Sequence, residues 1–298
     1  MTAVAGPAVA EAERSALQRR ALPVRRRRRR GPALRTGIQA VLVTIWCLLP
    51  AFWMLVGALR DPAYTFETTP WPTHVTLDNF VEAFDPADLL LRGLVNSLGI
   101  AVVVTVVALL IGATAGYAVA RWQFPGKSVV LGAAIAVSML PGASLVTPLY
   151  SIWSAPGWSY SYASLVIPYI ALALPFALYT LGEFFRNLPW ELEDAARVDG
   201  CSRLQAFRTV LVPLAAPALI TTGMLTFIAS WNEYVLASVL TNDRTATITV
   251  VIANFAAELT GYPVTMAAGV VATAPTILLV LLFQRRIANG LTTGSVKG

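Results

Sequence analysis

A short run between two apolar segments, residues 187–213, holds the side chains of this sequence that could act on another molecule. Carboxylates and small residues follow one another there: Glu191, Glu193, Asp194, Ala195 and Ala196. The carboxylates could pair with basic groups on a second protein, and the small side chains would let that protein approach closely. A solvated loop whose acids only favour the start of a helix would carry the same residues. The residues by themselves leave both interpretations open.

Turn signals divide this run into two short helices joined by an elbow. Asn187 can cap the first helix, with Pro189 near its first position, where a missing N–H costs little. Gly200 is expected to end that helix in a positive-φ conformation. Ser202 and Gln205 have the spacing of a capping box for the second helix. That helix would carry three apolar residues on one face: Leu204, Phe207 and Leu211.

The rest of the chain has the composition of a membrane protein. Hydrophobic residues make up 56% of the 298 and charged residues 13%, with a mean hydropathy of +0.65, whereas about a quarter of the residues of a soluble domain are charged. A helix needs roughly 20 apolar residues to cross a bilayer. We therefore expect an all-α membrane protein with six transmembrane helices, at 36–59, 93–120, about 128–150, 162–182, 209–232 and 259–284. The apolar segment Ile248–Ala257 is too short to cross and is expected to be re-entrant or interfacial.

Basic residues predict the orientation of these helices. Residues 1–36 are rich in Ala and Arg, and the like charges of Arg25–Arg30 are expected to keep this tail disordered. Its position directly before an apolar segment favours a cytoplasmic topology signal over a nucleic-acid-binding arm. With the amino terminus inside, only three of the 22 Lys and Arg residues fall outside: Arg60, Arg92 and Arg244. Both termini and the run 187–213 are then cytoplasmic.

One membrane domain is expected to follow the tail, over residues 37–298. Its core is predicted at 92–284, with a cytoplasmic loop at 184–213, and its last residues, 285–298, form a cytoplasmic tail. The external loop 61–91 would present a wetted surface to a partner. That loop carries six acids: Asp61, Glu67, Asp78, Glu82, Asp85 and Asp88.

Ionisable groups are scarce inside the membrane, which argues against a proton-coupled carrier or an ion channel. Glu233 stands in a Trp-Asn-Glu-Tyr stretch about 30 Å beyond Pro213 along a helix, which places it at the outer interface. An aromatic belt with a wetted acid is the favoured interpretation there, and a substrate gate is the alternative. Asn96 and Ser97 also lie near the outer face and could form hydrogen bonds across helices. The candidates for the translocation path are Asn96, Ser97, Asn232 and Glu233.

Small residues recur at every fourth position of the second span: Ala108, Gly112, Gly116 and Ala120. Such a stripe permits close helix packing in lipid, although an alanine-rich chain also produces the spacing by ordinary sampling. Prolines should bend or break the spans at six positions: Pro50, Pro141, Pro148, Pro168, Pro175 and Pro275. Pro141 and the Pro168/Pro175 pair are the expected flexible points, with simple kinking for packing as the alternative.

The residue types that usually hold metals or perform catalysis are few and scattered. Cys47 and Cys201 give neither a disulfide framework nor a metal-ligand spacing, and His74 is a lone histidine in a polar loop. The sequence also has no glycine-rich phosphate loop. We therefore expect no metal, no cofactor and no enzymatic activity in this chain.

The run 187–213 resembles the EAA loop of ABC-importer permeases. The residues that carry the resemblance are Asp194-Ala195-Ala196, Gly200, Val210, Val212 and Pro213. They match that loop's Glu-Ala-Ala, Gly, aliphatic pair and Pro at the same spacings, with Asp194 where Glu is usual. Further stretches resemble carbohydrate permeases of the maltose type, at 72–80, 96–97, 139–150, 231–234 and 290–298. The resemblance covers residues 37–298 and leaves the basic tail without a counterpart.

This resemblance implies the type I ABC importer permease fold, with the elbow as a coupling helix that docks in a groove of a separate ATPase subunit. It assigns that contact to Glu193, Asp194, Ala195, Ala196, Asp199, Gly200, Val212 and Pro213. A second contact with the ATPases is expected from the carboxyl tail, at Gly294, Lys297 and Gly298.

The resemblance also implies partners and a location. The chain would pair with a second, homologous permease on an ATPase dimer that binds ATP and Mg. An extracytoplasmic binding protein would deliver a sugar to it at the bacterial inner membrane, and no nucleic acid is expected. A permease for another solute, such as a polyamine, phosphate or peptide, is the alternative. A secondary carrier would need inverted repeats and midplane ion sites, and a channel a ring of selectivity groups, so both fit less well.

Overall fold

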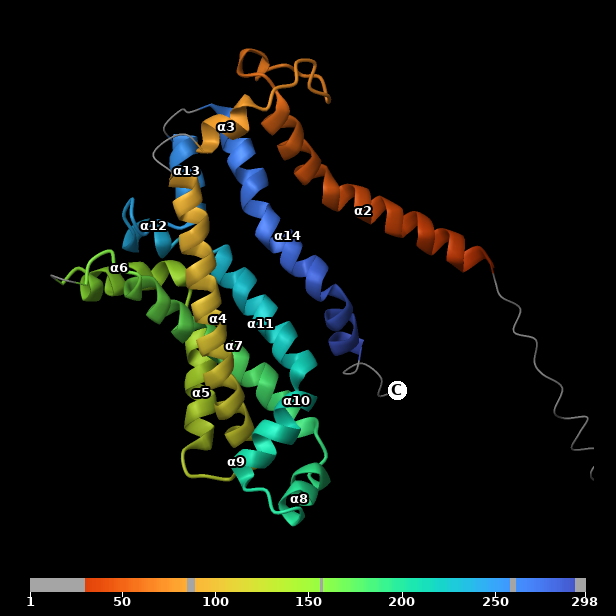
Figure 1. Cartoon of the computed structure of the whole chain (residues 1–298), viewed down its shortest axis with the longest axis vertical. Coiled ribbons are helices and arrows are strands. Elements are labelled where there is room, and N and C mark those ends of the chain that lie inside the picture. The colour runs from red at the N-terminus through yellow and green to blue at the C-terminus, as the bar shows by residue number, and fades with distance from the viewer. Residues whose placement is uncertain (1–29, 85–88, 156–157, 258–260, 293–298) are drawn as a thin grey trace, which may run out of the picture. The chain divides into compact units, whose positions relative to one another are not determined.

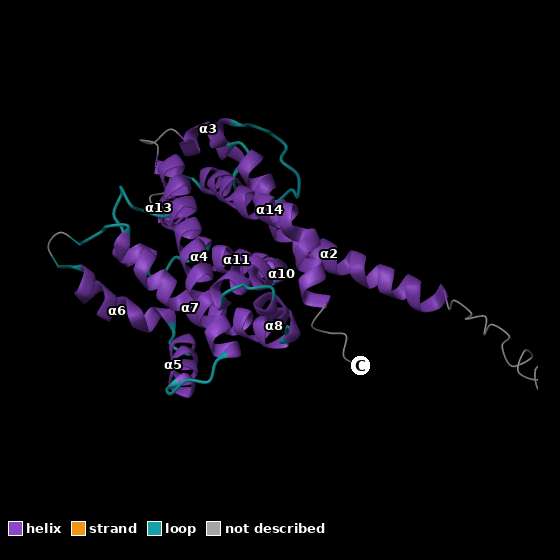
Figure 2. Cartoon of the chain, turned by 60° about the horizontal axis from the view of Figure 1, so that its bottom comes forward, coloured by secondary structure: helices purple, strands orange, loops and turns teal. Residues whose placement is uncertain are grey.

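The chain is seen here in a computed structural model, which describes residues 30–84, 89–155, 158–257 and 261–292. All regular elements in these ranges are helices (Figure 1). The only strand-like pairing among them is one antiparallel bridge between Arg60 and Val75, and Figure 2 shows helices and loops alone. The all-α prediction is confirmed. The chain falls into two compact units that divide between Pro50 and Ala51.

The first unit contains the amino-terminal part of α2 (Arg30–Leu59), a helix that continues across the division. Its side chains from Arg35 to Pro50 are exposed, and this apolar stretch therefore needs lipid or a partner to cover it. The helix begins at Arg30 rather than at the predicted boundary at residue 37. Pro32 is tolerated there because backbone N–H groups in the first turn of a helix have no acceptor within the helix, so the N–H that Pro lacks is not needed. Residues 1–29, where the rest of the predicted disordered tail falls, lie outside the described residues.

The second unit contains the remaining elements, joined by short loops. Its helices are α3 (Asp78–Phe84), α4 (Leu89–Arg121), α5 (Lys127–Ser138), α6 (Gly142–Trp153), α7 (Ala163–Asn187), α8 (Glu191–Val198), α9 (Arg203–Ala206), α10 (Val212–Leu214), α11 (Ala216–Trp231), α12 (Ala237–Leu240), α13 (Ile248–Ala257) and α14 (Tyr262–Thr292). A 3₁₀ turn occupies Pro62–Tyr64, and a π-helical turn, Phe207–Leu211, separates α9 from α10.

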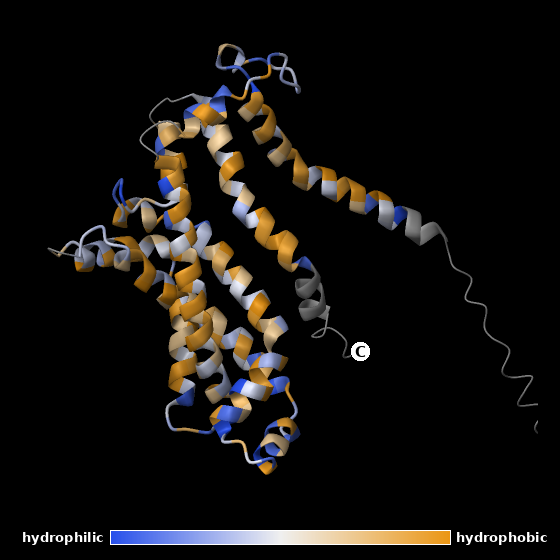
Figure 3. Cartoon of the chain, in the orientation of Figure 1, coloured by the Kyte–Doolittle hydropathy of each residue, from blue (hydrophilic) through white to orange (hydrophobic). Residues whose placement is uncertain are grey.

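Within the described ranges, four helices are long and apolar enough to cross a membrane: α2 over Arg35–Leu59, α4, α7, and α14 over Tyr262–Gln284. Two further spans would be bent pairs. α5 and α6 meet at 100°, and the segment Arg203–Leu214 meets α11 at 74°. The six predicted spans are therefore present if each bent pair counts as one, and the third is sharply broken. Apolar residues line the long helices, and hydrophilic residues gather around α8 and α9 (Figure 3).

Pro141 accounts for the break in the third span. α5 ends at Ser138, and Pro141 has an extended backbone with ψ of 128° before α6 begins, as expected for a residue that cannot continue a helix. The other five prolines that were expected to bend or break the spans lie inside continuous helices: Pro50, Pro148, Pro168, Pro175 and Pro275. At Pro168 and Pro175, where a flexible point was expected, α7 continues without a break. Both prolines are buried in α7, where neighbouring helices can hold the backbone.

The stripe of small residues on α4 packs against α7, as its spacing predicted. A Cβ added to Gly112 would lie 2.6 Å from the Cβ of Ala177, and one added to Gly116 would lie 2.8 Å from the backbone N of Gly182. No real Cβ approaches its neighbours so closely, so both positions require glycine. Lipid gives no hydrophobic drive for helix association, and close backbone packing of this kind therefore holds the pair together.

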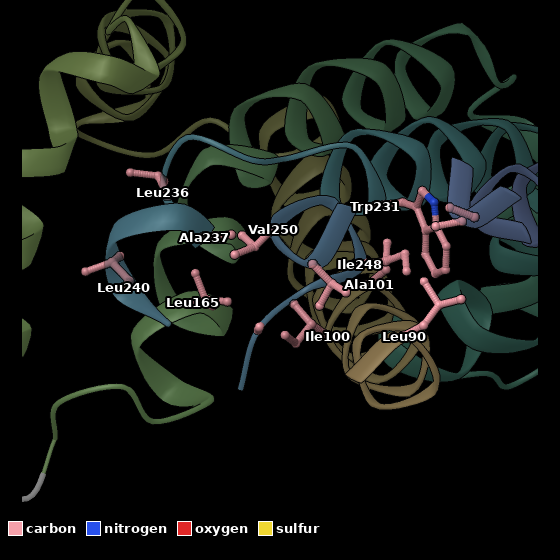
Figure 4. Close-up of a cluster of buried hydrophobic side chains, with 14 of the residues drawn as sticks. Leu90, Ile100, Ala101, Leu165, Trp231, Leu236, Ala237, Leu240, Ile248 and Val250 are labelled. Atoms are coloured by element: carbon pink, nitrogen blue, oxygen red, sulfur yellow. The ribbon is translucent and has the colours of Figure 1, made fainter. Parts of the chain in front are cut away.

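A buried apolar cluster joins α4 and α7 to the elements that follow α11 (Figure 4). Ile100 of α4, Leu165 of α7 and Ile248 of α13 belong to it. α13 approaches α4 so closely that a Cβ on Gly93 would lie 2.9 Å from Cγ2 of Val251. The segment predicted as re-entrant or interfacial is thus a ten-residue helix packed on α4, too short to cross by itself.

Replacing Gly116 by Val should force α4 away from α7, because the new Cβ would meet the backbone of Gly182. We expect a loss of about 1–3 kcal/mol, as for other overpacked contacts, and a lower thermal unfolding midpoint for the protein in detergent. Gly99→Val on the same helix is the matched control, since no atom lies within 4 Å of its Cβ position. Equal midpoints for the two variants would contradict this account of the packing.

Candidate functional site

The elbow predicted from the sequence is present, with one boundary moved. α7 runs to Asn187, whose side-chain amide donates to a carbonyl oxygen of that helix at 3.0 Å. Asn187 and Pro189 therefore precede α8, which has no side-chain cap, and the predicted cap is wrong because Asn187 closes α7 instead. Gly200 has φ of +91°, as predicted for the end of this helix. Ser202 and Gln205 form the predicted capping box, with hydrogen bonds of 3.3 and 2.7 Å.

The second helix of the elbow is irregular. α9 makes about one turn and then widens into the π-helical turn before α10. Pro213 in α10 has no N–H for the carbonyl of Thr209, four residues earlier, which favours a wider turn here. Phe207 and Leu211 are buried but Leu204 is exposed, so the predicted apolar face is wrong at Leu204, since the wider turn shifts the buried positions relative to α9. π-helical turns of this kind are frequent at functional sites.

One surface of the elbow mixes acidic and apolar side chains. The predicted contact residues that lie exposed are Asp194, Ala195, Asp199, Gly200 and Pro213, while Val212 is half-buried. Two apolar side chains lie beside them: Val198 is 88% exposed and Trp190 is 52% exposed. We call Trp190, Asp194, Ala195, Val198 and Asp199 the α8 surface. Large apolar side chains exposed together in this way are typical of a surface that binds another protein.

Two predicted contact residues face the interior instead. Ala196 is buried, and Glu193 is 6% exposed. The Glu193 carboxylate accepts a hydrogen bond of 2.9 Å from Tyr117 Oη, and its Oε2 lies 4.0 Å from Arg121 Nε. The prediction that Glu193 touches a partner is therefore corrected: successive residues of a helix point about 100° apart, and Asp194, exposed, takes the outward position.

A second buried cluster lies beneath α8 and fastens the elbow to the long helices. It contains Tyr117 of α4, Phe185 of α7, and Phe207 and Leu211 of the π-helical turn. The ring centroids of Tyr117 and Phe207 are 4.7 Å apart, and those of Tyr117 and Phe185 are 6.0 Å apart. The π-helical turn of the elbow is thus packed directly on the ends of α4 and α7.

Asn96 and Ser97 form the cross-helix hydrogen bonds that their position predicted. Asn96 Nδ2 donates to the carbonyl oxygens of Arg244 and Ala246 at 3.0 and 2.9 Å, and Asn96 Oδ1 accepts from Tyr162 Oη at 2.9 Å. Ser97 Oγ accepts from the backbone N of Ile248, at the start of α13, at 2.8 Å. Both amide protons of Asn96 are used, so the pair fastens the segment before α13 to α4. A role in the translocation path receives no support from these contacts.

Glu233 is half-buried and bonded, which differs from the wetted acid that was the favoured interpretation. Its Oε1 accepts from the backbone N of Leu236 at 2.9 Å, and its Oε2 accepts from the N of Ala237 at 3.1 Å and from Tyr169 Oη. The neighbouring Trp231 is buried against other helices rather than exposed in an aromatic belt. Asn232 is exposed and donates to the carbonyl of its own helix. The Glu233 carboxylate is turned away from solvent because it accepts hydrogen bonds from backbone N–H groups at the start of α12.

A cavity of about 200 Å³ lies beside Glu233, between α4, α7 and α11. Tyr169, Thr226 and Ser230 supply its other polar groups. The hydroxyl oxygens of Thr226 and Ser230 are buried and have no hydrogen-bond partner among the described residues, and Thr222 one turn earlier shares this property. A buried hydroxyl without a partner costs about 1–3 kcal/mol. The unpartnered hydroxyls on α11 therefore suit water in the cavity or a solute that is itself rich in hydroxyl groups. We call the cavity beside Glu233 the polar cavity.

Sequence reasoning missed the residues that hold these two places together. Tyr117 and Arg121 lie one turn apart at the end of the second span, a signal that could have marked them as partners for the elbow. The spacing of Thr222, Thr226 and Ser230 along one face of α11 was a second available signal. The predicted tail contacts, Gly294, Lys297 and Gly298, lie outside the described residues.

The chain belongs to the family of binding-protein-dependent transport system inner membrane components, whose sequence profile matches residues 108–293. Membership of this family confirms that the chain is a membrane transport permease of the ABC type, as the sequence resemblance implied.

Two relatives cover most of the chain. The trehalose transport system permease protein SugB of Mycobacterium tuberculosis is 47% identical over 264 residues, which cover 86% of this chain and 95% of that protein. The trehalose/maltose transport system permease protein MalG of Thermococcus litoralis is 39% identical over 267 residues, which cover 88% of this chain and 95% of that protein.

Solved structures share the fold. A chain of a bacterial ABC transporter involved in the import of the acidic polysaccharide alginate superimposes with a TM-score of 0.72 at 20% identity, covering 89% of this chain and 99% of that one. A chain of the bacterial alginate ABC transporter in complex with a pentasaccharide-bound periplasmic protein gives a TM-score of 0.64 at 15% identity, covering 87% and 96%. The predicted type I ABC importer permease fold is thereby confirmed.

Replacing Asn96 by Ala should loosen the segment before α13, because the carbonyls of Arg244 and Ala246 would lose their shared donor. We expect a loss of about 1–3 kcal/mol, typical of a buried hydrogen-bonding group left unpaired, seen as a lower thermal midpoint in detergent. Asn232→Ala is the control, since that amide is exposed and bonds only within its own helix. The assignment fails if both variants unfold at the wild-type temperature.

Proposed function

We propose that this chain is the permease subunit of an ATP-driven, binding-protein-dependent importer of a sugar. The observation that carries the proposal is the continuity of one stretch of chain, from the exposed α8 surface through the π-helical turn to α11 and the polar cavity. Movement of α8 would therefore be passed along this stretch to α11, whose hydroxyls line the cavity. The names of the two relatives, which refer to trehalose and to trehalose and maltose, support a sugar as the solute.

The energy source would be a separate ATPase dimer, which would bind ATP and Mg and dock against the α8 surface. Asp194 offers an outward carboxylate for a basic group, and Ala195 leaves room for a close approach. Val198 supplies the apolar area that such a contact needs. The carboxyl tail at Gly294, Lys297 and Gly298 is proposed as a second contact. This chain itself then performs transport without hydrolysing ATP.

We propose that the elbow and both termini face the cytoplasm of a bacterium, with the α13 end of α4 facing outward. The distribution of Lys and Arg supports this orientation. The connections at the α8 end carry six of the twelve Lys and Arg residues of the second unit: Arg121, Lys127, Arg186, Arg197, Arg203 and Arg208. The segments at the opposite end carry Arg60, Arg92 and Arg244.

The proposed partner on the outer side is an extracytoplasmic sugar-binding protein, and the loop before α3 is the proposed contact. Buried Arg60 organises this loop by donating to the carbonyl oxygens of Glu67 and Thr69. The loop holds Phe66 96% exposed and Trp71 65% exposed. A pre-organised loop that presents aromatic side chains loses little entropy on binding a partner.

A second, homologous permease would cover α5 and α6. Neither helix has a buried residue, although both are apolar along their length. Val129, Ile135 and Ile152 are among the side chains they leave exposed. Lipid alone could cover these helices, but their 100° bend would place backbone groups in the bilayer, which a protein partner shields better.

The groups that line the polar cavity favour a sugar over the other solutes considered. Three hydroxyls and one carboxylate, on Tyr169, Thr226, Ser230 and Glu233, suit the hydroxyl groups of a carbohydrate. Phosphate would require a cationic group, and the described lining of the cavity includes none. A polyamine importer is the second candidate, because Glu233 could pair with an ammonium group.

Reversing the charge of Asp194 should weaken attachment of the ATPase, and Gly200→Val should distort the elbow, because Val at φ of +91° is strained. We expect each variant to lower ATPase co-purification or sugar uptake at least about tenfold, equivalent to 1.4 kcal/mol, at an unchanged membrane level. Co-expression of the chain with its ATPase and partner permease, followed by affinity purification and uptake, measures both effects.

The matched controls lie at the opposite end of the unit. Asp243→Lys reverses another exposed acid, and Gly261→Val places Val at a similar φ of +97°. Wild-type assembly and uptake for Asp194→Lys and Gly200→Val would show that these residues only shape the helix ends, and the coupling role of the elbow would be abandoned.

Thr226→Val and Ser230→Ala should remove the hydroxyls of the polar cavity with little change in shape. We expect the KM for trehalose uptake to rise several-fold, while assembly with the ATPase stays at the wild-type level, since each hydrogen bond is worth about 0.5–1.5 kcal/mol. Thr221→Val is the control, because that hydroxyl already bonds to the carbonyl of Pro217. An unchanged KM in both cavity variants would remove the cavity from the sugar path. Competition of uptake by spermidine instead of sugar would favour the polyamine alternative.

A further inference from the structure

One ion pair links the elbow to the transmembrane helices, and nothing in the coupling surface itself explains it. Arg121 is the last residue of α4 and Glu193 lies in the first turn of α8. Their side chains are 1% and 7% exposed, with Arg121 Nε 4.0 Å from Glu193 Oε2. Buried charges are costly unless they are paired and hydrogen-bonded. This pair therefore needs a reason beyond filling space.

The pair sits within contacts that reach three elements. Tyr117 Oη, one turn earlier on α4, donates to Glu193 Oε1 at 2.9 Å. Arg121 Nη2 donates to the carbonyl of Leu188 at 3.0 Å, and its guanidinium lies over the ring of Trp190, 4.3 Å from the centroid. Leu188 and Trp190 belong to the link between α7 and α8. Arg121 thus holds both the link and α8.

The ion pair itself is not fully closed. Arg121 Nε and Nη1 and Glu193 Oε2 are buried and have no hydrogen-bond partner within the described part of the chain. A closed pair of this kind has an N–O distance of about 2.7–2.9 Å, so a shift of α8 of roughly 1 Å would complete it. Electrostatic energy changes steeply over that distance in a buried site. The position of α8 and the end of α4 are therefore coupled through this contact.

A displacement received at Arg121 would reach the polar cavity along packed backbone. α4 touches α7 at Gly112 and Gly116, where the helices cannot slide apart without losing their closest contacts. α7 carries Tyr169, which donates to Glu233 in the polar cavity. This route is distinct from the direct one through the π-helical turn and α11.

We propose that Arg121 and Glu193 are positioning residues for transport, and that their ion pair transmits displacement of α8 to α4 and α7. The proposal rests on the proposed function, since it assumes that a partner moves α8. It assigns Glu193 to force transmission inside the permease, where the resemblance to the EAA loop had assigned it to the partner surface. The two-state element is the ion pair, open at 4.0 Å here and closed when α8 advances.

The test uses the complete importer in proteoliposomes, with trehalose as the solute. The variants are Arg121→Met, Glu193→Gln and the double substitution, and the readout is sugar transported per ATP hydrolysed. We expect each single variant to lower this ratio at least about tenfold while ATPase co-purification stays within about twofold. The double variant should be no worse than the more severe single variant, since removing the second partner of a broken pair adds nothing.

Arg121→Lys is a milder variant, which retains the positive charge and serves as the test if Arg121→Met fails to fold. Its compact ammonium cannot contact Glu193, the Leu188 carbonyl and the Trp190 ring together, so the transport ratio should fall several-fold. The matched control is the exposed pair Arg186 and Glu183 on α7, with N–O 3.0 Å and side chains 56% and 60% exposed. Arg186→Met and Glu183→Gln should leave the ratio unchanged.

Three outcomes overturn the inference. One is a wild-type transport ratio in Arg121→Met or Arg121→Lys, and another is uptake that falls only in proportion to the assembled complex, which makes the pair structural. The third is an equal effect in the Arg186 control. Failure of the proposed function looks different, because the wild-type chain itself would then capture no ATPase and show no ATP-dependent uptake.

Discussion

Two glycines let the backbone of α4 touch that of α7, and the second unit is arranged around this contact. At Gly112 and Gly116 a Cβ would lie within 3 Å of the facing helix. Lipid provides no hydrophobic drive between helices, so the attraction here comes from atoms at van der Waals distance over adjacent turns. The pair in turn gives the elbow a fixed base and gives the polar cavity two of its three walls.

The elbow illustrates how a short segment becomes specific through its attachment. α8 has only eight residues and no side-chain cap, so it would not be a stable helix alone. The Glu193 carboxylate on its inner face accepts a hydrogen bond from Tyr117 of α4. Phe207 and Leu211 of the π-helical turn belong to the same buried cluster as Tyr117. With one face held in this way, Asp194 and Val198 remain outside. The α8 surface is thus presented by a rigid support rather than by a flexible loop.

Two of the membrane segments are sharply bent. The 100° bend at Pro141 and the 74° bend before α11 both interrupt segments that hydropathy alone describes as continuous. Proline explains why the helix stops at Pro141, but the direction taken by α6 is set by its neighbours, such as α12. The second bend joins the elbow to α11. Under the proposed function, a bend at this place would turn movement of the elbow into a change of tilt of α11, which lines the polar cavity.

The sequence by itself determined the features that depend on neighbours along the chain: the apolar lengths that can span a membrane, the positive φ at Gly200, the Ser202–Gln205 capping box and the stripe of small residues on α4. Local rules decide these, because the interacting residues are a few positions apart. Only the tertiary structure decided that Glu193 lies beside Arg121, that Asn96 donates to the carbonyl oxygen of Ala246 and that Glu233 accepts a hydrogen bond from Tyr169. These partners lie on different helices, and helical spacing fixes which residues share a face but not which helix that face will meet.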